Sequence, residues 1–118
     1  MARSAKPFLM FQGGEAAEAM AFYASLFPDG KVLDERTFTV AGQSVMCVNS
    51  PVKHAFDFTP SISLFIECES EAELRRLAAA LGDRGKELMP IANYGFSTLF
   101  SWVSDRFGVS WQLNLVQP

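Results

Sequence analysis

The chain has 118 residues, a length typical of one domain that buries roughly two thirds of the surface its unfolded form exposes. Hydrophobic residues make up 49% of it, which excludes wholesale disorder. The formal net charge is −3 and no extended basic run occurs, so we expect no nucleic-acid partner. The longest apolar runs are strand-sized and no signal peptide is evident, so we expect no membrane partner and a cytoplasmic location.

The first half of the chain predicts two strands, one helix and one extended segment. Apolar and polar residues alternate in the strands, and apolar residues recur at helical spacing in the helix. Glycine and proline mark the boundaries at Gly13-Gly14, Pro28 to Gly30 and Ala41-Gly42. The predicted elements are a strand over 7–12, a helix over 15–27, an extended segment over 31–40 and a strand over 44–49.

The second half predicts a similar order of elements after an irregular connection over 50–60. Ser61 to Cys68 is predicted as a strand. Ser70 can then cap a helix with Glu73 three residues on, and Gly82 suits the C-terminal cap of that helix. Its buried stripe is predicted to be Leu74, Leu77, Ala78 and Leu81. An extended segment over 86–91, a strand over 97–104 and a turn over 105–108 lead to a last strand that ends at 115.

The chain carries an internal repeat. When it is shifted by about 55 residues, Leu9 falls on Leu64, and Gly30-Lys31 falls on Gly85-Lys86. Each half is therefore predicted to hold a strand, a helix and two or three antiparallel strands, which is a βαβββ module or a shortened one. We predict a single domain of 1–118, with module one at about 7–49, a connection at about 50–60 and module two at about 61–116.

Paired modules of this kind predict an α+β fold whose sheets carry helices on one face and leave the other face open and concave. The residues expected to face the helices are Leu9, Phe11, Ile62, Leu64, Ile66, Trp111, Leu113 and Leu115. Polar and aromatic residues alternate with them, which suits a small-molecule site. The residues expected to bind a ligand are Phe8, Met10, Gln12, Ser61, Ser63, Phe65, Gln112 and Asn114. The register of the last hairpin, and so which of Tyr94, Phe96, Phe100, Trp102 and Phe107 face that site, stays open.

Six stretches resemble a known family: 7–11, 22–29, 50–54, 58–65, 94–97 and 105–115. Together they resemble the PhnB-like branch of the vicinal oxygen chelate superfamily, a branch often labelled 3-demethylubiquinone 3-methyltransferase. The superfamily includes glyoxalase I, extradiol dioxygenases and the fosfomycin and bleomycin resistance proteins. The resemblance implies the glyoxalase/bleomycin-resistance fold and a homodimer. PhnB-like sequences have a longer segment where this chain has Lys31 to Val40, so it stays open whether the first module lacks its hairpin.

The resemblance also implies where a metal would bind. Metal-dependent members of the superfamily use His and Glu at inward strand positions, which correspond here to Phe8, Met46 or Cys47, Ser61 and Gln112. Phenylalanine cannot coordinate a metal, Met and Cys are soft ligands, and Ser and amide oxygens are weak neutral donors. We therefore predict no metal at this place and no cofactor.

Few residues are candidates for catalysis. Glu67 is a candidate base only if strand alternation places it on the open face, and the alternative is a solvated carboxylate at a strand end. His54 is expected to organise its loop or a subunit contact ahead of acting as a base. Gly13-Gly14 stands between a strand and a helix but lacks the G-x-G-x-x-G pattern, so methyltransferase activity is not expected. Cys47 and Cys68 lack Cys-x-x-Cys spacing and are expected to be buried, reduced thiols.

The leading functional prediction is a PhnB-like protein that binds a small molecule in a concave cavity without a tightly held metal. A metal-assisted isomerase or lyase of glyoxalase type is one alternative, and a resistance-like protein that sequesters its ligand is another. The sequence does not decide whether the protein is an enzyme.

Overall fold

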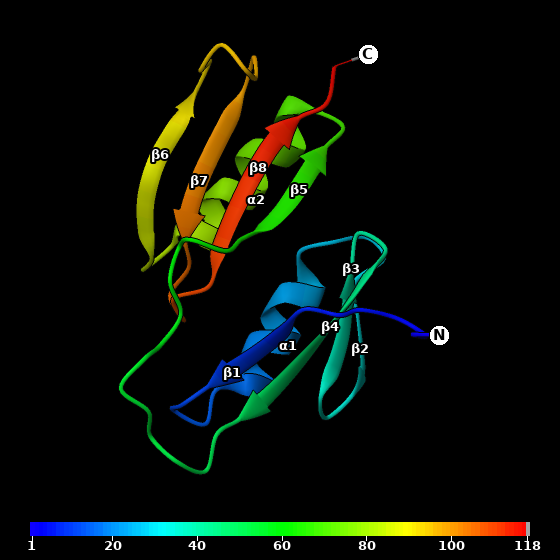
Figure 1. Ribbon diagram of the computed structural model, residues 1–118. Helices are drawn as coiled ribbons and strands as arrows, with labels where there is room; N and C mark the ends of the chain where they lie inside the picture. The colour runs from blue at the N-terminus through cyan, green and yellow to red at the C-terminus, as the bar shows by residue number, and fades with distance from the viewer. Residues whose placement is uncertain (118) are drawn as a thin grey trace. The chain divides into compact units, whose positions relative to one another are not determined.

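Two units of the same topology make up the chain in the computed structural model, which describes residues 1–117 (Figure 1). Contacts divide the chain into Met1–Asp57 and a second unit that begins at Phe58. Each unit has one helix and one four-stranded sheet. The predicted α+β fold with two repeated modules is confirmed. Within the described residues, neither helix is long and apolar enough to cross a membrane.

The first unit contains β1 (Phe8–Phe11), α1 (Ala16–Ser25), β2 (Lys31–Asp34), β3 (Thr37–Val40) and β4 (Gln43–Asn49). Its strand order is β1-β4-β3-β2, with β1 parallel to β4 and the other pairs antiparallel. The helix buries its apolar stripe against the sheet, where Tyr23 lies 5.5 Å from Phe38 between ring centroids.

The first unit has a complete hairpin between residues 31 and 40. The possibility that the first module lacks this hairpin is therefore wrong. β2 and β3 pair antiparallel, and Glu35-Arg36 forms the turn between them. The Arg36 N–H donates to Asp34 Oδ1 at 2.8 Å, which holds this two-residue turn. Every residue of β2 is exposed, so the strand has no buried alternation for sequence reasoning to detect.

The second unit contains β5 (Leu64–Cys68), α2 (Glu71–Gly82), β6 (Lys86–Ala92), β7 (Phe100–Ser104) and β8 (Ser110–Leu115). Its strand order, β5-β8-β7-β6, repeats that of the first unit, and β5 is parallel to β8. The shared order confirms the internal repeat. Figure 1 shows α2 against one face of this sheet, and the buried side chains on both are Leu74, Leu77, Leu81, Ile66, Val103, Trp111 and Leu113.

Three details of the second unit differ from the predictions. β5 begins at Leu64, so Ser61 lies in a turn outside the strand. Ile62 is 77% exposed, and the prediction that it faces the helix is wrong because the alternation begins after this turn. Ser70 does cap α2 by accepting from the Glu73 N–H at 3.1 Å, but Gly82 is the last helical residue and the cap is Asp83.

Both cysteines are free and buried, as predicted. Cys47 lies on β4 and Cys68 on β5, each on the helix-facing side of its sheet. Burial raises the pKa of Cys47 to about 12. Burial also raises the pKa of Cys68 to about 11, with smaller opposing effects of Glu73 and Arg76. Both groups are therefore neutral thiols at physiological pH.

Candidate ligand-binding site

The second sheet has a face turned away from α2, here called the open face. Residues that pair across neighbouring strands share a face, so the ladder registers define its members. β8 supplies the central polar row and is flanked by aromatic residues on β5 and β7. The members are Phe65, Glu67, Ser110, Gln112, Asn114, Phe100, Trp102, Ser104, Lys86, Met89 and Ala92.

A chain of hydrogen bonds runs across this open face. Trp102 Nε1 donates to Ser110 Oγ at 2.8 Å, and Ser110 Oγ lies 2.6 Å from Ser63 Oγ. Gln112 Nε2 donates to the same Ser63 oxygen at 3.2 Å. The Gln112 amide is thereby oriented through one N–H of its Nε2 atom, while its Oε1 atom has no hydrogen bond within residues 1–117. The arrangement presents a fixed acceptor to any ligand on this face.

An aromatic cluster lies beside this acceptor. Phe100 is only 2% exposed although it belongs to the open face, because other rings cover it. Between ring centroids, Phe96 lies 4.9 Å and Tyr94 6.1 Å from Phe100, both edge to face, and Phe65 lies 6.4 Å from Phe100. Tyr94 is anchored by its hydroxyl, which donates to the Pro90 carbonyl at 2.6 Å. Phe65 and Phe96 remain 56% and 69% exposed, so the cluster offers flat apolar surface to solvent.

The structure thus resolves the register that the sequence left open. Phe100 and Trp102 lie on the open face, and Tyr94 and Phe96 pack over Phe100. Phe107 lies in the turn after β7, where the Arg106 guanidinium stands 4.5 Å above its ring. Ser110 is a residue of the open face that the sequence-based ligand set left out, and Trp102 was left open there. Only the alternation of β7 against β8 could have indicated them.

Glu67 shares the open face, as strand alternation requires. It pairs with Asn114 across β5 and β8, and its side chain is exposed. Glu67 therefore adds a carboxylate to the edge of the face, beside the aromatic cluster. Five predicted ligand residues belong to this unit. The structure brings four of them together: Ser63, Phe65, Gln112 and Asn114. The fifth, Ser61, lies in the preceding turn and is hydrogen-bonded to Thr59.

The other three predicted ligand residues belong to the first unit. Phe8 pairs with Met46 and Met10 with Val48 across β1 and β4, so both lie on the face opposite the buried Phe11. Gln12 has a different role. Its Oε1 accepts from the His54 N–H at 2.6 Å, and its Nε2 donates to the Phe56 carbonyl at 2.7 Å. Both ends of the Gln12 amide hold the loop after β4.

His54 also serves this loop. Its ring stacks on Phe56 at 4.7 Å between centroids, and its Nε2 atom lies 3.3 Å from Ser50 Oγ. Ser50 Oγ donates its proton to the Val52 carbonyl at 2.5 Å, so the hydroxyl is not oriented as a nucleophile toward the imidazole. These contacts agree with the prediction that His54 organises its loop.

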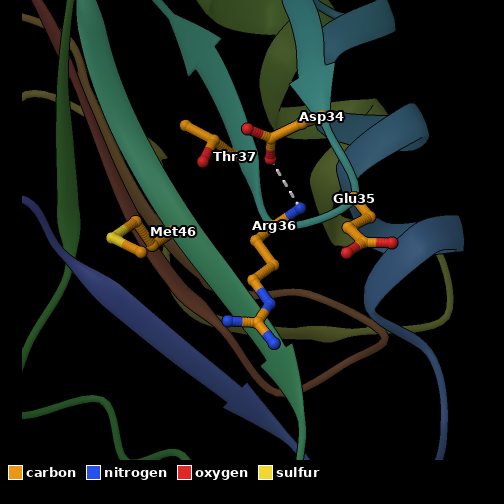
Figure 2. A pocket seen from close by; sticks show the side chains of 5 residues that line it. All are labelled: Asp34, Glu35, Arg36, Thr37 and Met46. Carbon is orange, nitrogen blue, oxygen red and sulfur yellow. Dashed lines mark hydrogen bonds between the residues drawn. The ribbon is translucent and has the colours of Figure 1, made fainter.

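A pocket of about 530 Å³ lies beside the β2–β3 turn of the first unit. Figure 2 shows the side chains that line it: Asp34, Glu35, Arg36, Thr37 and Met46. Two carboxylates and one guanidinium give it a mixed charge with a negative excess. Sequence reasoning missed this pocket because the pocket depends on the hairpin that the sequence left open.

The positions where superfamily members hold a metal do not fit one here. Cys47 is a buried neutral thiol on the helix-facing side of β4, and its strand neighbour Met46 points to the opposite side. Ser61 lies outside the strand, and the Gln112 amide is bonded to Ser63. Among residues 1–117, no three His, Cys, Asp or Glu side chains are grouped closely enough to hold a metal ion.

Comparison with known proteins places this architecture in a family. The sequence model of the 3-demethylubiquinone-9 3-methyltransferase family matches residues 32–114. A PhnB protein from Bacillus cereus with the same family description is 41% identical, with a TM-score of 0.92 over 97% of this chain and 100% of that one. The chain belongs to this PhnB-like family. A search of curated proteins gave no match.

Solved structures of lower sequence identity show only the fold of this PhnB-like chain. A Pseudomonas aeruginosa protein is 22% identical, with a TM-score of 0.79 over 99% of this chain and 100% of that one. A glyoxalase/bleomycin resistance protein from Albidiferax ferrireducens is 12% identical, with a TM-score of 0.66 over 97% of this chain and 100% of that one. These neighbours confirm the glyoxalase/bleomycin-resistance fold.

Proposed function

We propose that this PhnB-like protein binds a small molecule on the open face of its second sheet, without a tightly held metal. The observation that carries the proposal is the Gln112 amide, which Ser63 orients through its Nε2 atom so that Oε1 stays available. Such a preorganised acceptor beside exposed apolar rings is the usual make-up of a ligand site. Ser63, Phe65, Gln112 and Asn114 are its proposed ligand contacts, and Trp102 supports them through Ser110.

Methyl transfer is not part of the proposal, in spite of the family description. The common S-adenosylmethionine site follows a glycine-rich turn between a strand and a helix of a parallel sheet. Here both sheets are mixed, and the turn between β1 and α1 holds Gly14 at a φ of 76°. The first amide of α1, at Ala16, already donates to Asn49 Oδ1 at 2.9 Å. The glycines therefore serve a tight turn into the helix.

The proposal favours binding over a metal-assisted isomerase or lyase, because the residues at the superfamily's ligand positions are poor metal donors. A ligand that is recovered unchanged after long incubation would support a sequestering role, and a product would show turnover. We also propose that the two units form one domain.

The free thiols Cys47 and Cys68 support a reducing, cytoplasmic location for the protein. The net charge of −3 supports a ligand site that does not bind nucleic acid.

A homodimer is proposed as the assembly, and the edge strand β2 supports it. Its four residues, Lys31 to Asp34, are all exposed, and Val32 and Leu33 are 44% and 53% exposed. If two copies paired antiparallel at this edge, Lys31 of one copy would face Asp34 of the other, and Val32 would face Leu33. Light scattering at micromolar concentration should give the mass of two chains, and a monomer at every concentration would refute the dimer.

The test of binding uses nuclear magnetic resonance of the isotope-labelled protein with a fragment set of neutral, anionic and cationic ring compounds. Binding fragments should shift the side-chain amide signals of Gln112 and the backbone amide signal of its strand partner Phe65, and the shift of the Phe65 signal should be reduced in Gln112→Leu. A fragment set that leaves these signals unmoved would overturn the proposed site.

Metal binding is tested separately, by dialysis of the protein against zinc, nickel or manganese followed by elemental analysis. Stoichiometric uptake that Gln112→Leu abolishes would overturn the metal-free part of the proposal.

A further inference from the structure

We infer that the ligand of this open face is a planar aromatic molecule, neutral or cationic, that carries an N–H or O–H donor. The inference rests on the proposed function and adds the chemical class of the ligand. Three features of the open face carry it: the exposed rings, the balance of donors and acceptors, and the placement of charge.

The exposed rings set the shape of the ligand. Phe65 and Phe96 flank the buried Phe100 and leave more than half of their own surfaces exposed. Aromatic pairs favour offset or edge-to-face contacts with centroids roughly 4.5 to 7 Å apart, as the rings of this cluster already show. A flat ring placed on Phe65 and Phe96 would extend the cluster with the same geometry. A flexible aliphatic ligand would gain less from these two rings.

The hydrogen bonds set the polarity of the ligand. The indole N–H of Trp102 is engaged with Ser110, and one of the two N–H bonds of the Gln112 amide is engaged with Ser63. What remains beside the rings is one N–H of Gln112 and a larger acceptor capacity, from Gln112 Oε1 and the exposed Glu67 carboxylate. The Asn114 amide can act either way. A ligand that donates a proton therefore matches this face better than one that only accepts.

The charges set the sign of the ligand. Glu67 lies in the same cross-strand row as Asn114 and Phe100, so its carboxylate is beside the aromatic cluster. The cation of the open face is Lys86, which pairs with Ser104 in the row at the other end of β7. An anion seated on the rings would thus meet Glu67 before Lys86, and like charges repel at short range. The face disfavours anionic aromatic ligands.

The test compares two fluorescent probes that share one ring skeleton. N-phenyl-1-naphthylamine is neutral and has one N–H group, and 8-anilino-1-naphthalenesulfonate adds a sulfonate to the same frame. We expect the neutral probe to bind about tenfold more tightly, a difference that corresponds to about 1.4 kcal/mol. The N-methylated form of the neutral probe, which lacks the donor, should bind about fivefold more weakly than its parent.

Three variants assign these preferences to residues. Phe96→Ser, at an exposed ring, should weaken the neutral probe by about fivefold. Glu67→Gln should bring the affinities of the two probes closer, and Gln112→Leu should remove the preference for the N–H probe over its N-methylated form. Ile62→Ser is the matched control, since Ile62 is an exposed apolar residue of the same unit, 77% exposed against 69% for Phe96, and is not a member of the open face. It should leave all three affinities unchanged.

The outcomes separate this inference from the proposed function. If the sulfonate probe binds as tightly as the neutral one and still shifts the Gln112 amide, the binding site stands and the inferred class is wrong. If no probe shifts that amide, both are wrong. If Phe96→Ser instead converts a dimer into a monomer in light scattering, the aromatic cluster is a contact between two copies, which also overturns the inference.

Discussion

At the scale of single residues, Asp105 explains the most specific stretch of the sequence. Its side chain is 4% exposed, and Oδ1 accepts from the N–H groups of Phe107 and Val109 at 2.9 and 3.0 Å. Oδ2 accepts from Trp111 Nε1 at 2.9 Å. Gly108 completes the turn at a φ of 95°, which favours glycine. The stretch from 105 to 115 thus sets the start of β8, and with it the position of Gln112.

We therefore predict that Asp105→Ala destabilises the fold by about 3 kcal/mol, because it leaves two buried donors and one part-buried donor without their acceptor. Urea unfolding followed by tryptophan fluorescence measures the loss. Asp83→Ala is the control, since the Asp83 carboxylate is exposed and pairs only loosely with Arg84 at 3.6 Å. That change should cost no more than about 0.5 kcal/mol. Equal losses in the two variants would refute the anchoring role of Asp105.

At the scale of elements, the repeated Gly-Lys start of β2 and β6 has a steric cause. A Cβ atom on Gly30 would lie 1.8 Å from the Ala24 carbonyl oxygen, and one on Gly85 would lie 2.3 Å from the Ser104 carbonyl oxygen. Both contacts are with backbone, which cannot move without shifting an element. The two glycines share this need although their backbone neighbours differ.

Gly30→Ala and Gly85→Ala are each predicted to destabilise the protein by about 2 kcal/mol or more, as overpacking against backbone does. Gly82→Ala provides the contrast. A Cβ on Gly82 would be 3.9 Å from its nearest neighbour, a Val103 methyl group, and Gly82 lies within α2. Alanine there should stabilise by up to about 1 kcal/mol. Thermal unfolding ranks the three variants, and a Gly82→Ala variant as unstable as the other two would contradict the steric explanation.

Sequence reasoning was most successful where a buried face imposed a period on an element. The alternation of β8 and the helical stripe of α2 were both visible because one side of each element is buried. It failed where that constraint is missing. β2 is exposed throughout, and Ile62 is an exposed apolar residue before β5, so their patterns carried no such information. The open-face residues of β6 and β7 could not be predicted either, because the β6–β7 pair has two register irregularities that no local pattern predicts.

At the scale of the whole molecule, the open question is whether the two units unfold together, and the two cysteines can answer it. Cys47 lies in the first unit and Cys68 in the second, and both are buried. Burial raises their pKa values to about 12 and about 11, so the folded protein holds almost no thiolate at pH 8. A thiol reagent will therefore label each cysteine only after the unit that contains it has opened.

Each unit is only about 60 residues long, a size at which a domain is marginal alone. We accordingly predict that the single-thiol variants Cys47→Ala and Cys68→Ala show the same urea midpoint for labelling of the remaining cysteine, once corrected for the stability of each variant. Because folding raises both pKa values above 9.0, the stability from neutral thiols is complete below about pH 9 and is lost as the pH rises toward 11 and 12. Stability should therefore fall at alkaline pH, and more steeply with Cys47 present. In the labelling experiment, well-separated urea midpoints for Cys47 and Cys68 would show that the units unfold independently and would contradict the proposed single domain.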